Sequence, residues 1–320
     1  MSVVKWYAIM MPVLKEENEM TIVEEIKKLK KEKDAVILAH YYVRPEVQEI
    51  ADYIGDSFYL SKIAAGLQEQ VIVFCGVFFM GESAKVLSPD KTVLLPDIHA
   101  DCPMAHMANK ETIEKMRKQY DDLAVVCYIN STAELKNYAD VCVTSANAVK
   151  IVKALPNKNI FFIPDRNLAR HVASQVPEKN FIFNEGWCPV HEKLLLSELV
   201  ELKKMHPKAL VLTHPECKKE IVELSDYIGS TSGIIDFATK SEEKEFIICT
   251  ENGVLYELKK KNPDKVFYFT KTEPVCQDMK LITLEKIRDV LNTGKNIVSV
   301  NDDIREQSKK PLARMLELGK

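Results

Sequence analysis

The stretch AVILAHYYVRPEVQEIADYIGDSFYLSKIA, residues 35–64, decides the fold because it recurs twice more in the 320-residue chain. The second copy is LAVVCYINSTAELKNYADVCVTSANAVKIV, residues 123–152, and the third is ALVLTHPECKKEIVELSDYIGSTSGIIDFA, residues 209–238. Each copy starts with an apolar run that predicts a buried strand. An acidic segment typical of a helix and a second short strand follow. Repetition of this kind predicts three equivalent folding units.

Matching residues stand at matching distances in the three copies. The first strand ends in a polar or aromatic side chain each time: His40, Tyr128 and His214. A hydroxyl residue that opens the next helix follows 17 positions later, at Ser57, Ser145 and Thr231. A cysteine follows the strand end after 62, 60 and 62 positions: Cys102, Cys188 and Cys276. Such regular offsets indicate one unit that was copied twice.

The remainder of each unit extends the pattern to β-α-β-α-β-α-β. Apolar strands that alternate with amphipathic helices are typical of a parallel sheet covered by helices on both faces. We therefore predict an α/β protein of three homologous αβα domains, each with a four-stranded parallel sheet, arranged with pseudo-threefold symmetry. The predicted boundaries are an N-terminal extension over 1–20, repeats over 21–108, 109–196 and 197–285, and a C-terminal helical segment over 286–320.

Composition excludes several classes of function. The net charge is −3 with acids and bases well mixed, so the sequence offers no surface for nucleic acid. The longest apolar run, residues 71–81, is too short to span a bilayer, and the N-terminus does not read as a signal peptide. Eight cysteines are scattered over the chain without a CxxC pair, which favours a reducing, cytoplasmic setting.

The chemistry is expected beyond the carboxyl ends of the strands, where open parallel sheets bind ligands. If the three units face one axis, Cys102, Cys188 and Cys276 converge on one point. Three thiolates without a fourth protein ligand suit a [4Fe–4S] cluster with one open iron, whereas a closed zinc site needs four ligands. His191, three residues after Cys188, then need not bind metal. Other cysteines lie inside apolar strands and are expected in the core: Cys75, Cys127, Cys142 and Cys249. Cys217 stays undecided.

The hydroxyl residues predict the kind of substrate. Free N–H groups and the positive dipole end make a helix N-terminus a receptor for phosphate or carboxylate, although a serine or threonine there is more often only a cap. Three such ends around one cavity predict a small polyanionic substrate. Acids, bases and hydrogen-bonding groups are available beside it: His40, Tyr42, Tyr128, Asn130, His191, His214 and Glu216.

Together these residues resemble the quinolinate synthase family. The resemblance rests on the motifs AHYYVRPEVQEIADYIGDS, FCGVFFMGESAKVLSPDKTVLLPD, CYINSTAELK, VTSANAVKIV, GWCPVHEK, THPEC, GSTSGII and CQDMKLITLEKI. It implies a transferase of de novo NAD biosynthesis that makes quinolinate from iminoaspartate and dihydroxyacetone phosphate. It also implies three αβα domains around a central [4Fe–4S] cluster.

The resemblance further implies roles for individual residues. The cluster ligands would be Cys102, Cys188 and Cys276, with one iron left open. The substrate contacts would be His40, Ser57, Tyr128, Ile129, Asn130, Ser145, His214, Pro215, Glu216 and Thr231. Tyr42 and Glu216 would be the acid–base pair, with His191 and His214 as further catalytic residues.

Two other interpretations remain open from the sequence. A non-catalytic iron–sulfur sensor protein would explain the three cysteines equally well, but not the acid–base residues at matching offsets. A zinc-dependent lyase is the second alternative. The expected partners are the two small-molecule substrates and, transiently, the enzyme that produces iminoaspartate, with no nucleic acid and no membrane.

Overall fold

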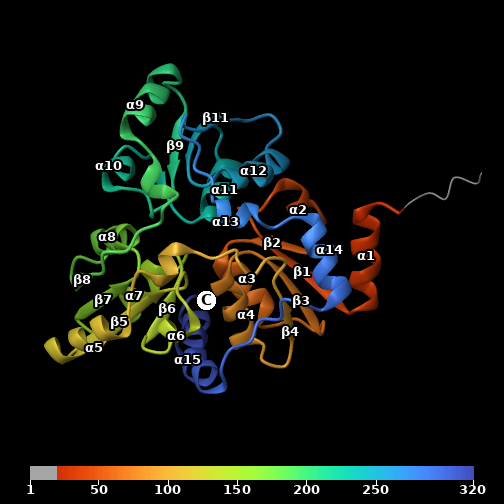
Figure 1. Ribbon diagram of the computed structural model, residues 1–320. Helices are drawn as coiled ribbons and strands as arrows, with labels where there is room; N and C mark the ends of the chain where they lie inside the picture. Colours follow the sequence, from red (N-terminus) through yellow and green to blue (C-terminus); the bar gives the residue numbers. More distant parts are fainter. Residues whose placement is uncertain (1–19) are drawn as a thin grey trace, which may run out of the picture.

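Three separate four-stranded sheets, in which every pair of neighbouring strands runs parallel, form the framework of the described residues, 20–320 of a computed structural model. Helices flank each sheet, and the three units lie around a common centre (Figure 1). The predicted α/β class with three αβα units is confirmed. The boundaries drawn between the units stay a prediction, and the proposed extension over 1–20 lies almost wholly outside the described residues.

The first unit has the sheet order β2 (Tyr53–Gly55), β1 (Ala35–His40), β3 (Val71–Cys75), β4 (Thr92–Leu94). Its helices are α1 (Ile22–Glu32), α2 (Pro45–Ile50), α3 (Ser57–Ala64) and α4 (Phe78–Leu87), followed by the 3₁₀ turn η1 (Pro103–His106). Helix α1 begins at a capping box, in which Thr21 and Glu24 each satisfy the backbone N–H of the other. Strand β1 is buried along its whole length, as its apolar sequence predicts.

The second and third units repeat this order. The second sheet contains β6 (Val141–Val143), β5 (Leu123–Tyr128), β7 (Asn159–Ile163) and β8 (Asn180–Phe183). Its helical segments are α5 (Lys110–Gln119), α6 (Ala133–Lys136), α7 (Ala148–Ala154), α8 (Arg166–Gln175) and η2 (His191–Lys193). The third sheet contains β10 (Tyr227–Ile228), β9 (Leu210–Thr213), β11 (Glu245–Cys249) and β12 (Val266–Tyr268). Its helical segments are α9 (Leu196–Met205), α10 (Lys219–Val222), α11 (Thr231–Lys240), η3 (Asn252–Val254), α12 (Leu255–Lys261) and α13 (Gln277–Lys280).

The strand order fixes where a ligand can bind. In each sheet the second strand lies on one side of the first and the third strand lies on the other. The connections therefore diverge between the first and third strands, and a crevice opens there at the carboxyl ends. The residues at or directly after these ends are His40, Tyr128 and His214 for the first strands, and Gly76, Pro164 and Thr250 for the third strands.

An aspartate at the same place in each repeat explains part of the recurring sequence. It precedes the second strand, and its carboxylate accepts a hydrogen bond from a backbone N–H of the first strand. The three bonds are Ile37 N to Asp52 Oδ2 at 2.8 Å, Val125 N to Asp140 Oδ2 at 2.7 Å, and Val211 N to Asp226 Oδ2 at 2.8 Å. Each aspartate thus extends the pairing of its two strands by one side-chain bond, which fixes their register.

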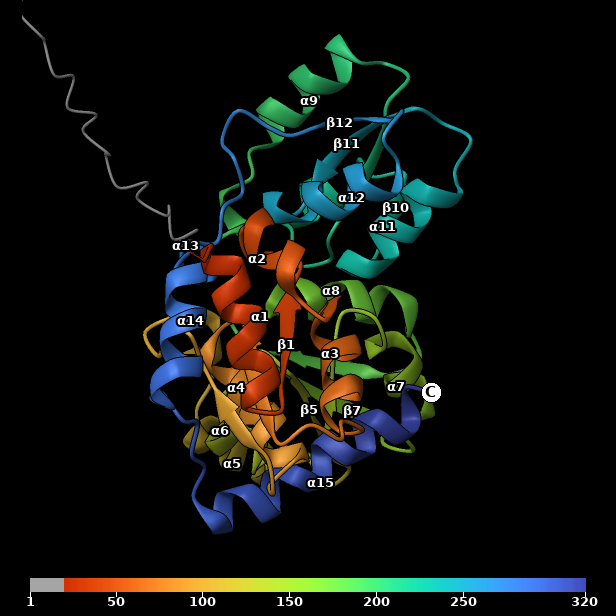
Figure 2. The same ribbon diagram turned by 90° about the vertical axis from the view of Figure 1, so that its right-hand side faces the viewer.

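The chain after the third sheet returns to the other two units. Helix α14 (Leu284–Thr293) packs against α1, and the following segment pairs with the edge of the first sheet, where Val298 N donates to Val93 O at 2.8 Å. Figure 2 shows α14 lying beside α1. Helix α15 (Asp302–Leu318) then packs against α4, α6 and β6. This segment joins units one and two. Among residues 20–320, no helix combines the length and the apolar character that crossing a membrane requires.

Candidate functional site

A cavity of about 170 Å³ lies at the centre of the molecule, and all three units contribute to its walls. Most of the residues expected at the site line it: His40, Tyr42, Ser57, Cys102, Tyr128, Asn130, Ser145, Cys188, His191, His214, Glu216, Thr231 and Cys276. Ile129 and Pro215 are buried beside these residues, but their side chains are not part of the walls. The sequence repeat therefore identified residues that are far apart along the chain and share one cavity.

The histidines at the ends of β1 and β9 adopt the same hydrogen-bonded arrangement. His40 Nδ1 accepts the backbone N–H of Tyr42 at 3.2 Å, and His214 Nδ1 accepts that of Glu216 at 3.4 Å. Burial lowers the pKa of His40 to about 4 and that of His214 to about 3. Both imidazoles are consequently neutral near pH 7 and carry their proton on Nε2. His214 Nε2 lies 3.2 Å from Ser145 Oγ and donates to it.

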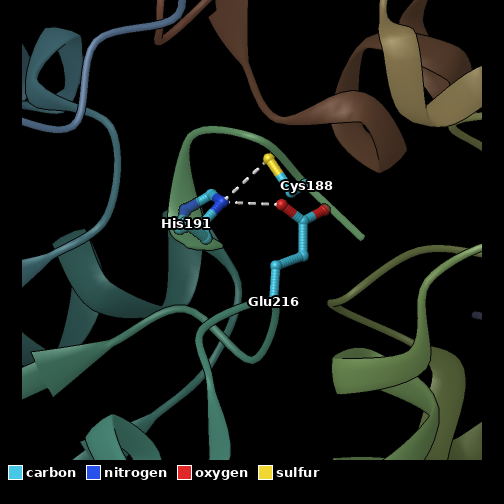
Figure 3. Close-up of side chains that lie close together, drawn as sticks. All are labelled: Cys188, His191 and Glu216. Atoms are coloured by element: carbon cyan, nitrogen blue, oxygen red, sulfur yellow. Dashed lines mark hydrogen bonds and ion pairs between the residues drawn. The ribbon is translucent and has the colours of Figure 1, made fainter. Parts of the chain in front are cut away.

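Glu216 connects the third unit with the second through its two carboxylate oxygens. Oε1 accepts from the hydroxyl of Tyr128 at 2.6 Å, and Oε2 lies 2.8 Å from His191 Nδ1 (Figure 3). Burial acts to raise the pKa of Glu216, but the imidazoles of His214 and His191 and the hydrogen bonds from His191 and Tyr128 lower it below the ordinary value. Glu216 is therefore a buried carboxylate that stays ionised at neutral pH.

A continuous chain of hydrogen bonds leads from Glu216 to the first unit. His191 Nε2 lies 3.0 Å from Thr250 Oγ1, which lies 2.8 Å from the hydroxyl of Tyr42. That hydroxyl lies 2.7 Å from Thr231 Oγ1. Glu216, His191 and Thr250 thus form the carboxylate–imidazole–hydroxyl arrangement that moves protons in many enzymes. Burial raises the pKa of Tyr42 well above its ordinary range, so its hydroxyl is a proton donor at neutral pH.

Thr250 is the member of this chain that sequence reasoning missed. It follows β11 directly and is fully buried. The residues at the matching positions of the other repeats are Gly76 and Pro164, which carry no hydroxyl group. A search for residues that agree in all three repeats therefore passes over Thr250. Its position at the end of a third strand, beside the crevice, is the signal that would have found it.

The hydroxyl residues expected at helix N-termini agree with the structure in two cases of three. Ser57 and Thr231 are the first residues of α3 and α11, whose caps are the preceding Asp56 and Ser230. The prediction that Ser145 opens a helix is wrong, since α7 starts only at Ala148.

The local reason is a turn ahead of α7. The side chain of Asn147 accepts the backbone N–H of Thr144 at 2.7 Å, which holds residues 144–147 in this turn. Ser145 lies within the turn, and its hydroxyl is directed to His214 at 3.2 Å.

The three cysteines expected as ligands occupy similar local structures. Cys102 directly precedes η1, Cys276 directly precedes α13, and Cys188 lies three residues before η2. Burial raises the pKa of each thiol, for Cys276 to about 11, while backbone N–H groups just after each cysteine act in the opposite direction. The sulfurs are thus protonated in the cavity unless a cation binds, and amides are in place to stabilise them as thiolates.

One group in the described residues also has the spacing for a single metal ion. The ligand atoms of Cys188, His191 and Glu216 lie within 4.8 Å of one another, and all three residues are buried. Cys188 Sγ is 3.2 Å from His191 Nδ1 (Figure 3). This buried group could bind a metal. Both nitrogens of His191 already have partners in Glu216 and Thr250, so the hydrogen bonds alone explain its orientation.

The remaining cysteines and histidines lie outside the cavity. Cys75, Cys127, Cys142 and Cys249 are buried within strands, as expected for core residues. Cys217, which the sequence left undecided, is also buried. His106 forms an exposed pair with Asp101 at 2.6 Å, and neither His99 nor His171 lines the cavity.

Acidification is expected to destabilise the protein without bound metal. The unfolded chain protonates its histidines near pH 6.5, whereas His40 and His214 stay neutral in the fold until about pH 4 and 3. The unfolded state therefore binds more protons between these values. Stability is fully present above pH 6.5 and falls as the pH is lowered, by roughly 3 kcal/mol for His40 and roughly 5 kcal/mol for His214 once the pH is below their folded-state pKa values. Thermal unfolding at a series of pH values measures this loss. His40→Asn, which retains an acceptor for the Tyr42 amide, should give a shallower slope, and an unchanged slope would contradict the assignment.

Gly186 is expected to tolerate no larger side chain. A Cβ at this position would lie 2.5 Å from Pro164 O and 2.9 Å from Met107 Cβ, in the loop that leads to Cys188. Because one of these neighbours is rigid backbone, Gly186→Ala should destabilise the fold by about 1–3 kcal/mol. Gly66→Ala is a matched control, since its nearest neighbour would be 3.8 Å away. Equal unfolding temperatures for the two variants would refute the close approach.

Comparison with known proteins gives one consistent result. The family model described as Quinolinate synthetase A protein matches residues 24–317. A protein from Fusobacterium nucleatum subsp. nucleatum with the name quinolinate synthase is 56% identical over 295 residues, which is 92% of this chain and 98% of the relative. Relatives of the same name from Caldicellulosiruptor bescii and Clostridioides difficile are 54% and 53% identical, covering 94% and 92% of this chain and 100% and 97% of their own. The similarity extends over all three sheets.

Proposed function

The chain belongs to the quinolinate synthetase A protein family, and on this premise we propose that it forms quinolinate from iminoaspartate and dihydroxyacetone phosphate. One phosphate and two waters leave in the reaction, which balances all atoms. The observation that carries the proposal is the central cavity, at which three cysteines and a hydrogen-bonded chain of acid–base groups meet. A sensor protein would need the cysteines but not this chain, so the geometry favours an enzyme.

Cys102, Cys188 and Cys276 fit the role of ligands to a [4Fe–4S] cluster. All three line one cavity, and their chemistry as soft thiolate donors suits iron–sulfur groups. Sulfurs that share one zinc ion at about 2.3 Å lie roughly 4 Å apart. The three cysteines do not form such a close group among the described residues. The space between them therefore suits a cluster that is larger than a single ion. When bound, a cluster with one iron free of protein ligands supplies a Lewis acid to the cavity.

The substrates fit the remaining polar groups of the cavity. We propose the N-termini of α3 and α11 as the phosphate site, where Ser57 and Thr231 add hydroxyl donors. Neutral His40 offers Nε2–H to a substrate oxygen. Asn130 Oδ1 is buried without a hydrogen-bond partner in the described chain, and Asn130 lines the cavity. An unsatisfied acceptor at this place favours a ligand that carries an N–H or O–H group.

The proton transfers fall to the hydrogen-bonded chain. Carbon–carbon bond formation and ring closure require protons to be removed from carbon and delivered to departing hydroxyl groups. Glu216 is ionised, and through His191 and Thr250 it provides a base. Tyr42 is protonated at the other end of the chain and provides an acid. Because the chain is continuous, a proton taken up at one end can return to the substrate at the other.

An anaerobic assay tests the proposed function. The protein is reconstituted with iron and sulfide, and quinolinate is measured after addition of dihydroxyacetone phosphate and freshly generated iminoaspartate. We expect quinolinate to form at one equivalent per phosphate released, and formation to stop when the metal is removed by a chelator. Quinolinate formation at the same rate after complete removal of iron would refute the role of the cysteines, and the absence of product from cluster-loaded protein would refute the activity.

A further inference from the structure

Glu251 is a fully buried carboxylate that the proposed mechanism does not use. It follows Thr250, and its side chain accepts the backbone N–H of Cys276 at 3.0 Å through Oε1 and that of Gly253 at 2.6 Å through Oε2. The ammonium group of Lys280 lies 2.9 Å from Oε1. A buried carboxylate with three donors is fixed in position. Glu251 therefore holds the backbone at Cys276 in place relative to the end of β11.

Lys280 extends this arrangement into the first unit. It is the last residue of α13, the short helix that begins directly after Cys276. Besides contacting Glu251, its ammonium group donates to the backbone carbonyl of Tyr42 at 2.7 Å. One side chain thus connects the loop of the third cysteine with the backbone of Tyr42. The backbone oxygen of Lys280 in turn accepts from Arg44 Nε at 2.8 Å.

The residues around the contact of Lys280 with Glu251 and Tyr42 are tightly packed. Gln48 Nε2 donates to the carbonyls of Tyr41 and Val43 at 2.9 and 3.0 Å, and lies 3.1 Å from Gly253 O. A Cβ on Gly253 would lie 2.8 Å from both Glu251 Oε2 and Tyr41 O, and 2.9 Å from Lys280 Nζ. Units one and three approach each other here as closely as a glycine allows.

The second unit has a carboxylate at the same place. Asp165 lies two residues beyond the end of β7, as Glu251 lies two residues beyond the end of β11, and it is also fully buried. Its Oδ1 accepts the backbone N–H of Leu168 at 2.6 Å and so caps α8, whereas its Oδ2 has no hydrogen-bond partner in the described chain. The first unit has Val77 at this position, and the N–H of Cys102 instead bonds Asp101 Oδ1 at 2.8 Å, near the surface. Among the described residues, a hydrogen bond between this buried carboxylate and the backbone of a cysteine loop is therefore a feature of the third unit.

We propose that Glu251 and Lys280 are positioning residues that hold the Cys276 ligand and Tyr42 at a fixed separation across the boundary between units three and one. The inference rests on the proposed function, because it assigns Cys276 to a cluster and Tyr42 to proton transfer. Glu251 reaches the cavity wall, but its carboxylate oxygens are bound by the amides of Cys276 and Gly253 and by Lys280, which itself is not among the cavity walls. Their loss should loosen the cysteine loop and displace the tyrosine together.

The decisive variant is Lys280→Met, which retains most of the side-chain volume and removes the ammonium group. Two quantities are measured on anaerobically reconstituted protein: the rate of iron release to a chelator, and kcat and KM for quinolinate formation. We expect iron release about tenfold faster or more. We expect kcat to fall about 10- to 100-fold with KM changed less than about threefold, since misplacement of a catalytic group by about 1 Å affects turnover more than binding.

Matched variants separate positioning from a general loss of folding. Lys286→Met removes another partly buried lysine nearby, which contacts Asp97 and the carbonyl of Leu281 instead, and should behave like wild type. Lys280→Arg should recover part of both effects because a guanidinium group can donate to both oxygens. Gly253→Ala perturbs the same contact without changing a charge and should reproduce both effects. Thermal unfolding of each metal-free variant shows whether it folds. If Lys280→Met does not fold, Gly253→Ala and Lys280→Arg test the inference in its place.

The possible results of these experiments distinguish failure of this inference from failure of the proposed function. Faster iron release and lower kcat in both Lys280→Met and Gly253→Ala, with Lys286→Met unchanged, support the inference. Wild-type iron retention and wild-type kcat in folded Lys280→Met or Gly253→Ala would overturn it while leaving the proposed function intact. Wild-type protein that takes up no cluster and makes no quinolinate would instead overturn the proposed function, and this inference with it.

Discussion

Replacing Cys188 with alanine is expected to abolish both cluster binding and quinolinate formation. Cys188 contributes one of three sulfurs to the central cavity, and two cysteines from separate units leave the proposed cluster without its third anchor. Loss of a Lewis acid that stabilises developing charge by several kcal/mol corresponds to at least about a 10³-fold lower rate. Iron and sulfide analysis, the visible absorption spectrum and the anaerobic assay measure these losses.

Cys75→Ala is the matched control for this variant. Cys75 is fully buried, and it ends β3 and lies outside the cavity walls. The control should keep its iron, its colour and its turnover, with only a small loss of stability. A colourless Cys188→Ala protein with full activity would contradict the role of the cluster, and a fully loaded one would contradict the ligand assignment.

Glu216→Gln is expected to keep the cluster and lose turnover by about 10²- to 10⁴-fold. The carboxylate accepts hydrogen bonds from both Tyr128 and His191, one on each oxygen. A glutamine has one acceptor oxygen and one donor NH₂ group in their place, so it can satisfy only one of these partners in its present orientation. It also has no charge with which to support a proton on His191.

Glu192→Gln provides the same chemical change outside the cavity. Glu192 pairs with Arg166 at 2.9 Å and with Asn167 at 3.3 Å, and it is not among the cavity walls. We expect its kcat to stay within about threefold of wild type, because the change preserves the shape of the side chain and lies outside the cavity walls. The assignment of Glu216 as a base would fail if its glutamine variant turned over at a comparable rate while carrying the full complement of iron.

The sequence was informative where the three repeats agree. Residues at equal offsets, such as His40 and His214, follow equivalent strands, and the parallel topology brings equivalent strand ends to one centre. The recurring aspartates had a local cause that the structure makes plain, since each bonds the neighbouring strand. The fold class and nine of the residues that line the cavity could therefore be predicted from spacing alone.

The sequence did not predict features in which one repeat differs from the others. Thr250 and Lys280 have no hydroxyl or ammonium counterparts that a comparison of repeats would identify, and their roles depend on contacts between units. The return of the chain to the edge of the first sheet, where Val298 pairs with Val93, likewise depends on long-range packing. Ser145 was misplaced because the side chain of Asn147 closes a turn ahead of α7.

The most direct test of the central claim is an anomalous-scattering map at the iron absorption edge from crystals grown without oxygen. The account predicts one compact group of iron atoms at the centre of the molecule. It should lie within bonding distance of the sulfurs of Cys102, Cys188 and Cys276, with one iron bound to no protein atom. A single ion held by Cys188, His191 and Glu216, with the other two cysteines unbound, would contradict it.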